Sequence, residues 1–467
     1  MKTLYIITLF LFSFSLMAQK ARIEGRVYDA ANNEPLPFSN VLIRGTQTGA
    51  SSDFDGKYII TQVDPGFYIL EVRSLGYETF VTPEFQVIPG KTVTIDVPLQ
   101  KNATLLSEIK VEAPVVVRKD ESPVSLRTIS ISQIENSAGA NRDISKVIQT
   151  FPGVAAFPAA NRNDIIVRGG GSNESRFYLD GVEIPNINHF ATQGASGGTN
   201  GILNADFMRE ANFYSSAFPA MYGNATSAVF DFKQIDGNPD RIRFRGTLGA
   251  SETALTVDGP LSENHTMIFS LRRSYLQFLF KVIGLPFLPT YNDYQYKSRI
   301  RLDSKNEIKI ISVGAYDVNR LDTDLKNPTE FQQYLLNYIP GSEQWNYAIG
   351  GVHTHYRQNG YSNLVLSRNM LTNTSSKYLN NDDSDASALL LKYSSSEIEN
   401  KFRYETMQQL TRGKLDYGID GGQIKYTNCT FQKIYTGDSL RTVDFSSDMI
   451  FYRYGIFAQY TRRFYDN

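Results

Sequence analysis

The chain has 467 residues and a formal net charge of −1, from 47 basic and 48 acidic side chains. This near-equal number of basic and acidic residues argues against a nucleic-acid-binding surface. The single cysteine, Cys429, excludes an intramolecular disulfide framework and cysteine-rich metal sites. Aromatic residues make up 12% of the chain, with 28 Tyr, 29 Phe and a single Trp.

The first residues, MKTLYIITLFLFSFSLMAQK, have the pattern of a secretory signal peptide. Lys2 gives a charged start, Leu4 to Leu16 is a short apolar run, and Ala18 is a small residue before Gln19. The run is too short for a membrane-spanning helix. We therefore expect residues 1–18 to be a signal peptide that is cleaved near Ala18. An exported chain without long apolar segments is either a secreted β-protein or an outer-membrane β-barrel.

Residues 19–100 predict a small β-sandwich. Five β-rich runs, RIEGRVYD, FSNVLIRG, GKYIIT, GFYILEVRS and KTVTIDVPL, are separated by Asp-Gly and Pro-Gly turn pairs. The segment LPFSNVLIRGTQTGASSDFDGKYIITQVDPGFYILEVRSLGYE resembles the carboxypeptidase-regulatory-like domain, a transthyretin-like sandwich found ahead of other domains. No His-Glu zinc motif follows, so the resemblance implies an accessory module without peptidase activity. Asp53 and Asp55 fit turn chemistry better than calcium binding.

Residues 101–123 form a linker that contains one extended apolar–polar segment, Ser107–Ala113, with the sequence SEIKVEA. By itself this segment has two interpretations, which stay open at this point. It is a spare edge strand of the sandwich, or it is an exposed strand that pairs with the sheet edge of a partner.

Residues 124–235 have mixed α/β character. A short helix is predicted over Arg142–Gln149, with Asp143 in its first turn, where a carboxylate suits the helix dipole. Four motifs follow in order: PGV, VRGG, YLDGVEI and YGNATSAVFDF. Their order and spacing resemble the plug of TonB-dependent outer-membrane receptors. The residues that carry this plug motif are Arg168, Gly169, Gly170, Asp180, Gly181, Tyr222 and Gly223.

The glycines Gly169–Gly171 follow an apolar run, as the glycines of a phosphate-binding loop do. A P-loop needs a helix and a Lys-Ser/Thr pair after its glycines. Here a second strand, Arg176–Ile184, follows instead. The glycines are therefore predicted to form a strand-to-strand turn with positive φ.

Residues 236–467 alternate with period two, which predicts a transmembrane antiparallel β-barrel, apolar outside and polar inside. Short connections alternate with long ones, as in outer-membrane barrels. The short ones are expected near Pro260–Asn264, Asp303–Asn306, Arg357–Gly360 and Thr411–Gly413, and the long ones over Tyr275–Gln295, Arg320–Ser342, Leu379–Ser387 and Thr430–Asp444. About ten strands cannot enclose a plug, whereas the family's barrel has about 22. We therefore expect a partial barrel, from a truncated chain or gene.

The sequence offers no catalytic constellation, so no enzyme activity, cofactor or metal is predicted. His353 and His355 share one face of a predicted strand and could bind a metal, but such a pair is more often solvated or faces a lumen. The run Tyr275–Pro289 is strongly apolar, and we expect it to pack in an extracellular loop or to touch the membrane interface.

The resemblance implies a mechanism and partners. The TonB C-terminal domain would pair by strand addition with a TonB box in the linker and pull on the plug. This box comprises Glu108, Ile109, Lys110, Val111, Glu112 and Ala113. A small extracellular ligand would bind the apical loops 156–163 and 183–201. Outer-membrane lipids would surround the barrel, and the family plan also allows a surface lipoprotein partner.

Candidate substrate contacts in the two apical loops are Phe157, Asn161, Arg162, Asn188 and His189, although each could instead merely cover the plug surface. Arg168 matches a plug arginine that pairs with barrel carboxylates in this family. Ser215 stands where a second such arginine is common, which puts a second ion pair in doubt.

The sequence thus predicts a mainly β outer-membrane receptor that imports a ligand through a plugged barrel with energy from TonB. The alternative is a cell-surface binding or adhesin-type receptor without active transport.

Overall fold

A computed structural model describes residues 21–82, 84–87, 92–101, 125–129, 133–134, 137, 143–156, 163–195, 197–198, 200–239, 241–249, 251–410, 413–436 and 439–462. The predicted signal peptide and the predicted TonB box, Glu108–Ala113, lie outside these ranges. The chain divides into two compact units, one formed by residues 1–30 and 34–106 and the other by residues 31–33 and 107–467.

The first unit is a β-sandwich, as predicted. One sheet has the order β10-β1-β4, with β9 also paired to β1, the second has the order β3-β2-β6-β7, and β5 pairs with β8. The side chains that alternate inward from both sheets form one apolar core, which includes Ile23, Val41, Ile60, Leu70 and Val97. The strands are β1 (Ala21–Asp29), β2 (Asn40–Ile43), β3 (Gly49–Ser51), β4 (Lys57–Val63), β5 (Gly66–Tyr68), β6 (Leu70–Arg73), β7 (Phe80–Val81), β8 (Phe85–Val87), β9 (Thr92–Thr94) and β10 (Val97–Leu99).

The turn before β4 confirms the interpretation of its aspartates as turn residues. The Asp53 carboxylate accepts hydrogen bonds from the backbone N–H groups of Asp55, at 3.0 Å, and Lys57, at 2.8 Å. Gly56 has a φ of 74°, a conformation that glycine adopts without strain. The Asp53 side chain therefore satisfies the backbone of its own turn.

The second unit contains a small mixed domain, called here the plug. Its central sheet has the order β11-β16-β17-β14-β15, in which β14 and β17 are parallel and the other neighbours antiparallel. A separate hairpin, β12–β13, and the helix α3 complete it. The elements are β11 (Leu126–Ile129), α3 (Ile144–Ile148), β12 (Val154–Ala156), β13 (Ile165–Val167), β14 (Arg176–Leu179), β15 (Val182–Ile184), the 3-10 helix η2 (Ala205–Phe207), β16 (Met208–Tyr214) and β17 (Val229–Gln234).

The helix predicted over Arg142–Gln149 is confirmed as α3. Asp143 is its N-cap: the carboxylate accepts a hydrogen bond from the backbone N–H of Ser145 at 2.9 Å. The other oxygen of Asp143 accepts from the N–H of Gly201 at 2.8 Å and from the Asn163 amide at 3.0 Å. One carboxylate therefore caps the helix and fixes two loops of the plug.

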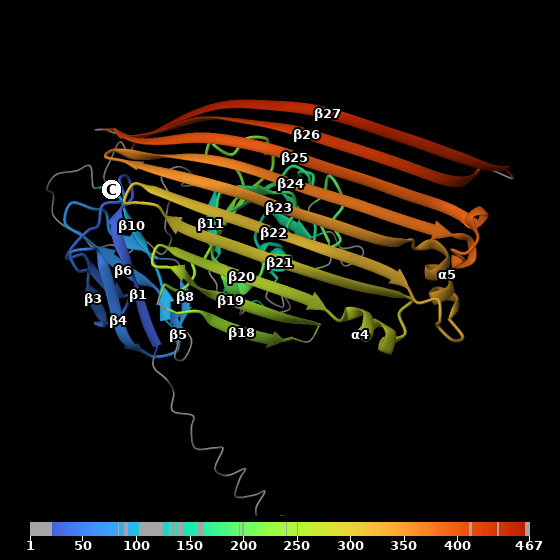
Figure 1. The fold of residues 1–467 in the computed structure, drawn as a ribbon, viewed down its shortest axis with the longest axis horizontal. Helices are drawn as coiled ribbons and strands as arrows, with labels where there is room; N and C mark the ends of the chain where they lie inside the picture. Colours follow the sequence, from blue (N-terminus) through green and yellow to red (C-terminus); the bar gives the residue numbers. More distant parts are fainter. Residues whose placement is uncertain are drawn as a thin grey trace, which may run out of the picture. The chain divides into compact units, whose positions relative to one another are not determined.

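The remainder of the second unit is one ten-stranded antiparallel sheet, called here the wall, in which each strand pairs with its neighbours in the chain, as Figure 1 shows. The strands are β18 (Arg243–Leu248), β19 (Glu252–Ser262), β20 (His265–Ser274), β21 (Phe287–Arg301), β22 (Asn306–Leu321), β23 (Gly341–Arg357), β24 (Gly360–Tyr378), β25 (Leu389–Leu410), β26 (Gly413–Thr436) and β27 (Ser439–Thr461). The helices between them are α4 (Leu276–Ile283), α5 (Glu330–Tyr338), η3 (Leu379–Asn381) and η4 (Ala386–Ala388).

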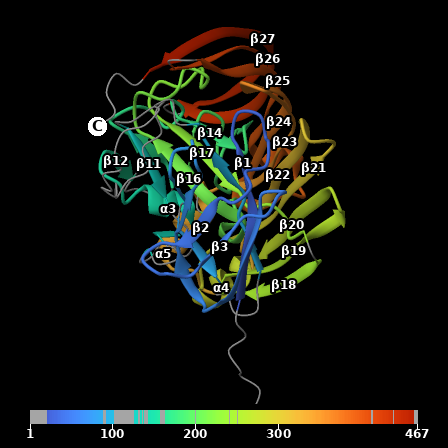
Figure 2. The ribbon, with the colours of Figure 1, turned by 90° about the vertical axis from the view of Figure 1, so that its left-hand side faces the viewer.

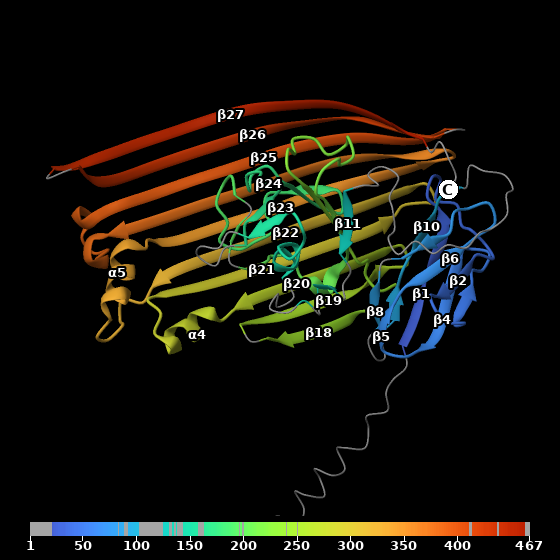
Figure 3. The same cartoon turned by 180° about the vertical axis from the view of Figure 1, so that it is seen from behind.

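The wall has two chemically distinct faces, and the plug lies against one of them, the inner face. Figure 2 shows the sheet curving around the plug from β18 to β27, and Figure 3 shows the plug elements in front of the central wall strands. On the outer face apolar side chains are exposed, among them Phe244 at 73%, Leu366 at 57% and Ile456 at 88%. The predicted alternation of apolar-out and polar-in positions is therefore confirmed.

Two of the predicted long connections are wrong in extent. The predicted loop Thr430–Asp444 is a hairpin, because β26 and β27 continue to Thr436 and from Ser439. β21 already begins at Phe287, inside the predicted loop Tyr275–Gln295. Polar residues occupy both faces of strands that have water on both sides, so these strand ends have the composition of loops.

The apolar run that begins at Tyr275 forms α4, which ends at Gly284 in the left-handed conformation, with a φ of 79°. Gln332 of α5 donates a hydrogen bond to the carbonyl of Gly284 at 2.6 Å, so the two helices are tied together. Among the described residues, no helix is long and apolar enough to cross a bilayer.

A first prediction concerns the sandwich. Ile23 is fully buried, whereas Ile59, on the neighbouring strand, is 51% exposed. Ile23→Ala should lower the free energy of unfolding of this unit by about 2–5 kcal/mol, and the matched change Ile59→Ala by less than about 1 kcal/mol. The measurement is the calorimetric melting transition of the sandwich in the full chain. Equal shifts for the two variants would contradict the described core.

Candidate functional site

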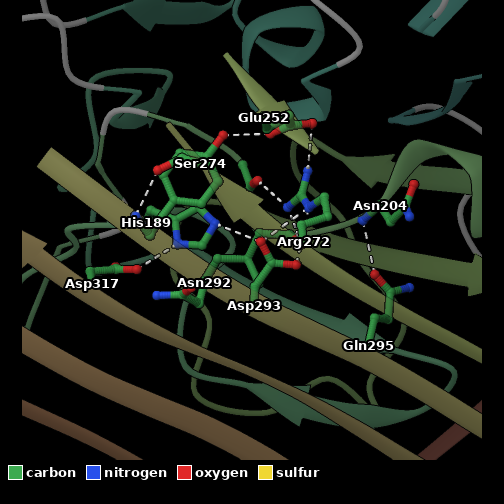
Figure 4. Close-up of polar contacts among 12 residues, drawn as sticks. His189, Asn204, Glu252, Arg272, Ser274, Asn292, Asp293, Gln295 and Asp317 are labelled. Atoms are coloured by element: carbon green, nitrogen blue, oxygen red, sulfur yellow. Dashed lines mark hydrogen bonds and ion pairs between the residues drawn. The ribbon is translucent and has the colours of Figure 1, made fainter. Parts of the chain in front are cut away.

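The candidate site is the interface between the plug and the wall. One of its fully buried polar side chains is His189, in the predicted apical loop 183–201. The Nδ1 atom of the ring lies 2.7 Å from a carboxylate oxygen of Asp317 on β22, and Nε2 lies 3.1 Å from one of Asp293 on β21. Tyr291 stacks on the ring at a centroid distance of 4.1 Å. Figure 4 shows the imidazole with a carboxylate on each side.

Arg272 on β20 extends this cluster. Its Nε atom donates to both oxygens of Asp293 at 3.0 Å, and its Nη2 atom donates to the carbonyls of Gly201 and Ile202, at 2.8 and 2.7 Å. Asp293 therefore lies between a cation of the wall and the histidine of the plug (Figure 4). Arg272 of the wall thus binds the plug in two ways: it donates to backbone carbonyls of the plug, and it shares the Asp293 carboxylate with His189.

The charges around His189 determine its protonation. Burial of the ring by itself lowers its pKa, but the carboxylates of Asp317 and Asp293 more than offset this and raise the pKa of His189 to about 9. At neutral pH the imidazole therefore carries a positive charge and donates a hydrogen bond to each carboxylate.

A second cluster joins the end of the plug to the wall. The Lys297 ammonium on β21 lies 3.3 Å from a carboxylate oxygen of Asp180 and 2.8 Å from one of Asp236. Arg299 donates to the other oxygen of Asp236 at 2.9 Å. Burial raises the pKa of Asp236, but Lys297 and Arg299 outweigh this and hold the pKa well below its usual range.

Asp180 reaches Lys297 because of the turn that carries it. Asp180 and Gly181 are the two residues between β14 and β15, and both have positive φ, 48° and 92°. Asn-Gly and Asp-Gly pairs favour this two-residue hairpin turn. The turn also presents the Gly181 carbonyl to Arg403 of the wall, which donates to it at 2.9 Å.

A third cluster surrounds Glu183 on β15. Lys401 on β25 lies 3.1 Å from its carboxylate, and Arg453 on β27 lies 3.6 Å from it. Burial of Glu183 raises its pKa, but these cations, together with Arg176, outweigh burial, so the pKa of Glu183 is lowered. Beside this cluster Val182 packs directly on Gly350 of β23, where a Cβ atom would come within 2.6 Å of the valine.

Taken together, the plug contributes mainly carboxylates to the interface and the wall contributes cations. The plug–wall ion pairs of this polarity are Asp180–Lys297, Glu183–Lys401, Glu183–Arg453, Asp206–Arg245, Asp236–Lys297 and Asp236–Arg299. The His189 cluster has the opposite polarity, with the cation on the plug. Apolar side chains also join the two parts, because Ile311, Val313 and Val352 of the wall belong to the same buried core as the plug.

Among the described residues Arg168 forms no ion pair with a carboxylate of the wall, so its expected barrel partner stays a prediction. Its side chain is exposed, and its guanidinium contacts the Ser215 hydroxyl at 3.4 Å instead of a carboxylate of the wall. Arg168 and Gly169 both have positive φ, 51° and 78°, so the residue belongs to the turn that follows β13. In this orientation the side chain lies away from the wall carboxylates, whose partners are instead His189 and wall cations.

The Gly-rich segment does form the predicted strand-to-strand turn, because it connects β13 with β14. A Cβ atom on Gly170 would come within 2.7 Å of the Ser227 hydroxyl, which donates to the Val167 carbonyl. Tyr222 of the plug motif is buried against Tyr178 at a centroid distance of 4.8 Å, while Gly223 lies beside it near Asp420 of the wall. These residues shape the plug.

Of the candidate substrate contacts, Phe157, Asn161 and Arg162 lie outside the described residues. Asn188 and His189 are fully buried, and the Asn188 amide oxygen accepts from the Ser145 hydroxyl at 2.7 Å. In this arrangement both side chains are occupied by the protein, and contact with a ligand would require the loop to move. Their role in substrate binding stays a prediction.

The described residues contain no group of three or more His, Cys, Asp or Glu side chains arranged to hold a metal ion. His353 and His355 both hydrogen-bond to the same amide oxygen of Asn306, at 3.2 and 2.9 Å.

The wall residues of the site were missed by the sequence analysis. Asp293, Gln295, Lys297 and Arg299 alternate on β21 and face the plug, in the sequence DYQYKSR. This period-two row of polar residues is the signal that could have identified them.

Two family models match the chain. The carboxypeptidase regulatory-like domain matches residues 22–100, and the TonB-dependent receptor plug domain matches residues 118–229. The chain is 23% identical over 371 residues to the TonB-dependent transporter Oar of Myxococcus xanthus, which covers 72% of this chain and 32% of Oar. It is 24% identical over 262 residues to the TonB-dependent receptor SusC of Bacteroides thetaiotaomicron, which covers 53% of this chain and 24% of SusC.

The wall and plug also resemble a solved structure, a variant of the ferric enterobactin receptor PfeA of Pseudomonas aeruginosa. The TM-score is 0.50 at 14% identity, over 75% of this chain and 62% of PfeA, a likeness that shows the fold alone. The chain spans about a third of the length of Oar and about a quarter of SusC. The resemblance predicted from the sequence is confirmed: the chain combines a carboxypeptidase regulatory-like domain with the plug and wall fold of TonB-dependent receptors.

A second prediction tests the His189 cluster. Asp317→Ala should weaken the attachment of the plug by about 3–5 kcal/mol, because it leaves a buried imidazolium with only one of its two carboxylates. The measurement is the urea concentration at which a protease begins to cleave the plug of the full protein. The control, Asp383→Ala, changes an exposed aspartate in the connection from β24 to β25 and should have little effect. Equal behaviour of the two variants would contradict the anchoring role.

A third prediction concerns pH. The pKa of His189 is raised from 6.5 to about 9, so its contribution of about 3 kcal/mol is complete below pH 6.5 and lost as the pH rises through 9. The groups that face the ring are Asp293, Asp317 and Tyr291, with Arg272 behind Asp293. The urea midpoint for plug cleavage should therefore decrease as the pH rises from about 6.5 to about 9 and change little above that. His189→Gln should remove this fall, and an unchanged pH profile in that variant would exclude His189 as its cause.

Proposed function

For a chain that carries the regulatory-like and plug domains of a TonB-dependent receptor, we propose an outer-membrane receptor that binds an extracellular ligand and imports it with energy from TonB. One observation carries this proposal. A separate plug is attached by buried ion pairs to the polar face of a long-stranded antiparallel sheet whose other face is apolar and exposed. Such a domain is stable at rest and releasable by force.

The proposed location follows from the outer face of the wall. A strand that crosses a bilayer needs about 9–11 residues, and the strands from β21 to β27 have 15 to 24. They are long enough to cross and to extend beyond the membrane at the end that carries α4 and α5. The signal peptide predicted over residues 1–18 supports export to this location.

The proposed mechanism begins in the linker. TonB would add a strand to the predicted box Glu108–Ala113 and pull on the chain ahead of the plug. The first described plug strand after the box is β11, which lies at the edge of the plug sheet and pairs with β16 through four residues. Force on the linker would therefore reach β11 first, and an edge strand with a single neighbour is the part of a sheet that separates most readily.

As the plug is partly withdrawn, the pulling force would next act on the ion-pair clusters. Each pair exchanges its protein partner for water when it opens, so the clusters resist separation but can form again. We propose that their reversible opening lets the ligand pass along the inner face of the wall. Asn188 and His189, with Phe157, Asn161 and Arg162, would then lie on the path of the ligand.

The alternative function is a cell-surface receptor or adhesin whose plug no longer gates uptake. It shares the same wall and plug and differs in that it needs no contact with TonB. A surface lipoprotein partner, which the family plan allows, is compatible with both functions.

A fourth prediction separates the two functions. Val111→Pro removes a backbone N–H donor from the predicted TonB box, so strand addition should fail and binding of the purified TonB C-terminal domain should weaken at least about tenfold. The matched change Val111→Ile keeps the donor and should bind as the unmodified protein does. Binding is measured with the full protein in outer-membrane fractions. If the unmodified protein does not bind TonB, the surface-receptor alternative is favoured.

A further inference from the structure

A row of polar side chains crosses the apolar outer face of the wall. It consists of Tyr347 on β23, Arg368 on β24, Asn400 on β25, Gln423 on β26 and Tyr452 on β27, and is called here the polar row. Arg368, Asn400, Gln423 and Tyr452 are direct cross-strand neighbours. Their side chains form one continuous chain of hydrogen bonds. Arg368 donates to the Tyr347 hydroxyl at 3.1 Å and to Asn400 at 2.8 Å, Asn400 donates to Gln423 at 3.3 Å, and Gln423 donates to Tyr452 at 3.3 Å.

Arg368 differs from the cations that face the plug. Lys297, Lys401 and Arg453 each lie within 4 Å of a carboxylate. The two hydrogen bonds of the Arg368 guanidinium use Nε and Nη1 and go to neutral groups, and no carboxylate of the described residues forms an ion pair with it. A cation without a counter-ion on the lipid-facing side of a barrel is destabilising, most at the membrane centre and less near the surface. An anion beside Arg368 would therefore stabilise the arrangement.

Below the polar row, toward the end of the wall with the short turns, the outer face is hollowed. A depression of about 670 Å³ is lined by four residues of the polar row, Arg368, Asn400, Gln423 and Tyr452, and by apolar side chains that include Ile349, Leu366 and Phe402. Gly351 contributes no side chain, and a Cβ atom there would meet nothing within 4 Å. The depression is thus amphipathic, with a polar edge and an apolar floor.

The height of the polar row agrees with a membrane surface. Trp345 is one outward-facing position beyond Tyr347 on β23, toward the end of the wall with the long connections. Their rings pack at a centroid distance of 6.1 Å, and Trp345 is 55% exposed. Tyr and Trp gather where the apolar band of a barrel meets the headgroups. The polar row therefore lies at headgroup level, with the apolar floor beside the acyl chains.

We propose that this depression binds one membrane lipid with a phosphorylated headgroup, whose phosphate contacts Arg368 and whose acyl chains cover Leu366 and Phe402. Guanidinium and phosphate form short, charge-assisted and often bidentate hydrogen bonds. Free phosphate would match Arg368 but leave the apolar floor uncovered, and a neutral lipid would cover the floor but leave Arg368 without an anion. The inference rests on the proposed position of the wall in a membrane.

The test uses the full protein in lipid nanodiscs that contain phosphatidylcholine with a minor fraction of phosphatidylglycerol. Lipids that remain bound are counted by native mass spectrometry. Arg368→Met should reduce the retention of phosphatidylglycerol about tenfold. Arg273→Met is the matched control, because Arg273 is an exposed arginine of β20 whose side chain also bonds a neutral group, Asn292. A second variant, Gly351→Leu, fills the depression and should lower retention although Arg368 is unchanged.

Three results would overturn the inference. The first is equal retention of phosphatidylglycerol by Arg368→Met and Arg273→Met, and the second is retention of phosphatidylcholine by the unmodified protein to the same extent as phosphatidylglycerol. The third is displacement of the bound lipid by millimolar inorganic phosphate. The heat-modifiable mobility of each variant on a gel reports whether its barrel is folded. If the unmodified protein inserts and is heat-modifiable but retains no lipid, the lipid site is wrong and the proposed function stands.

Discussion

Charge compensation across the plug–wall interface is the constraint on which the second unit depends. The inner face of the wall carries ionisable groups on consecutive strands, and burial of each group is tolerable only if a counter-ion lies opposite. The plug provides these counter-ions from places that its own fold fixes: the Asp180–Gly181 turn, Glu183 in the middle of β15, and the segment after β17 at Asp236. The plug sheet is therefore positioned by electrostatics as much as by packing.

The His189 cluster has a different character from the carboxylate–cation pairs. There the plug supplies the positive charge, and the charge exists because two wall carboxylates keep the ring protonated. Lysine and arginine side chains stay charged at neutral pH, whereas an imidazole can lose its proton. The interface thus combines ion pairs whose charges are permanent with one cluster, that of His189, whose positive charge depends on the neighbouring carboxylates.

The outer face of the wall follows the opposite rule. Many of its side chains are apolar and exposed, and the polar row interrupts this pattern. The same alternation along each strand creates both faces. A single residue thus changes from anchoring the plug to facing lipid when its strand register shifts by one position.

The sequence by itself determined the elements that rest on local chemistry. Period-two alternation predicts the two faces of the wall, Asp-Gly pairs predict the tight turns, and the order of four short motifs identifies the plug, because each signal is contained within a few consecutive residues. The glycines after β13 could be separated from a phosphate-binding loop on the same local grounds.

Only the tertiary structure decided which charges meet. Asp293 and Asp317 lie more than 100 residues from His189, and Lys401 lies more than 200 from Glu183, so no local pattern relates them. Arg168 was assigned a partner from the family pattern, but the positive φ of its turn directs it elsewhere. Pairing of this kind depends on strand register and on the packing of the plug against a curved sheet, and these arise only when distant strands come together.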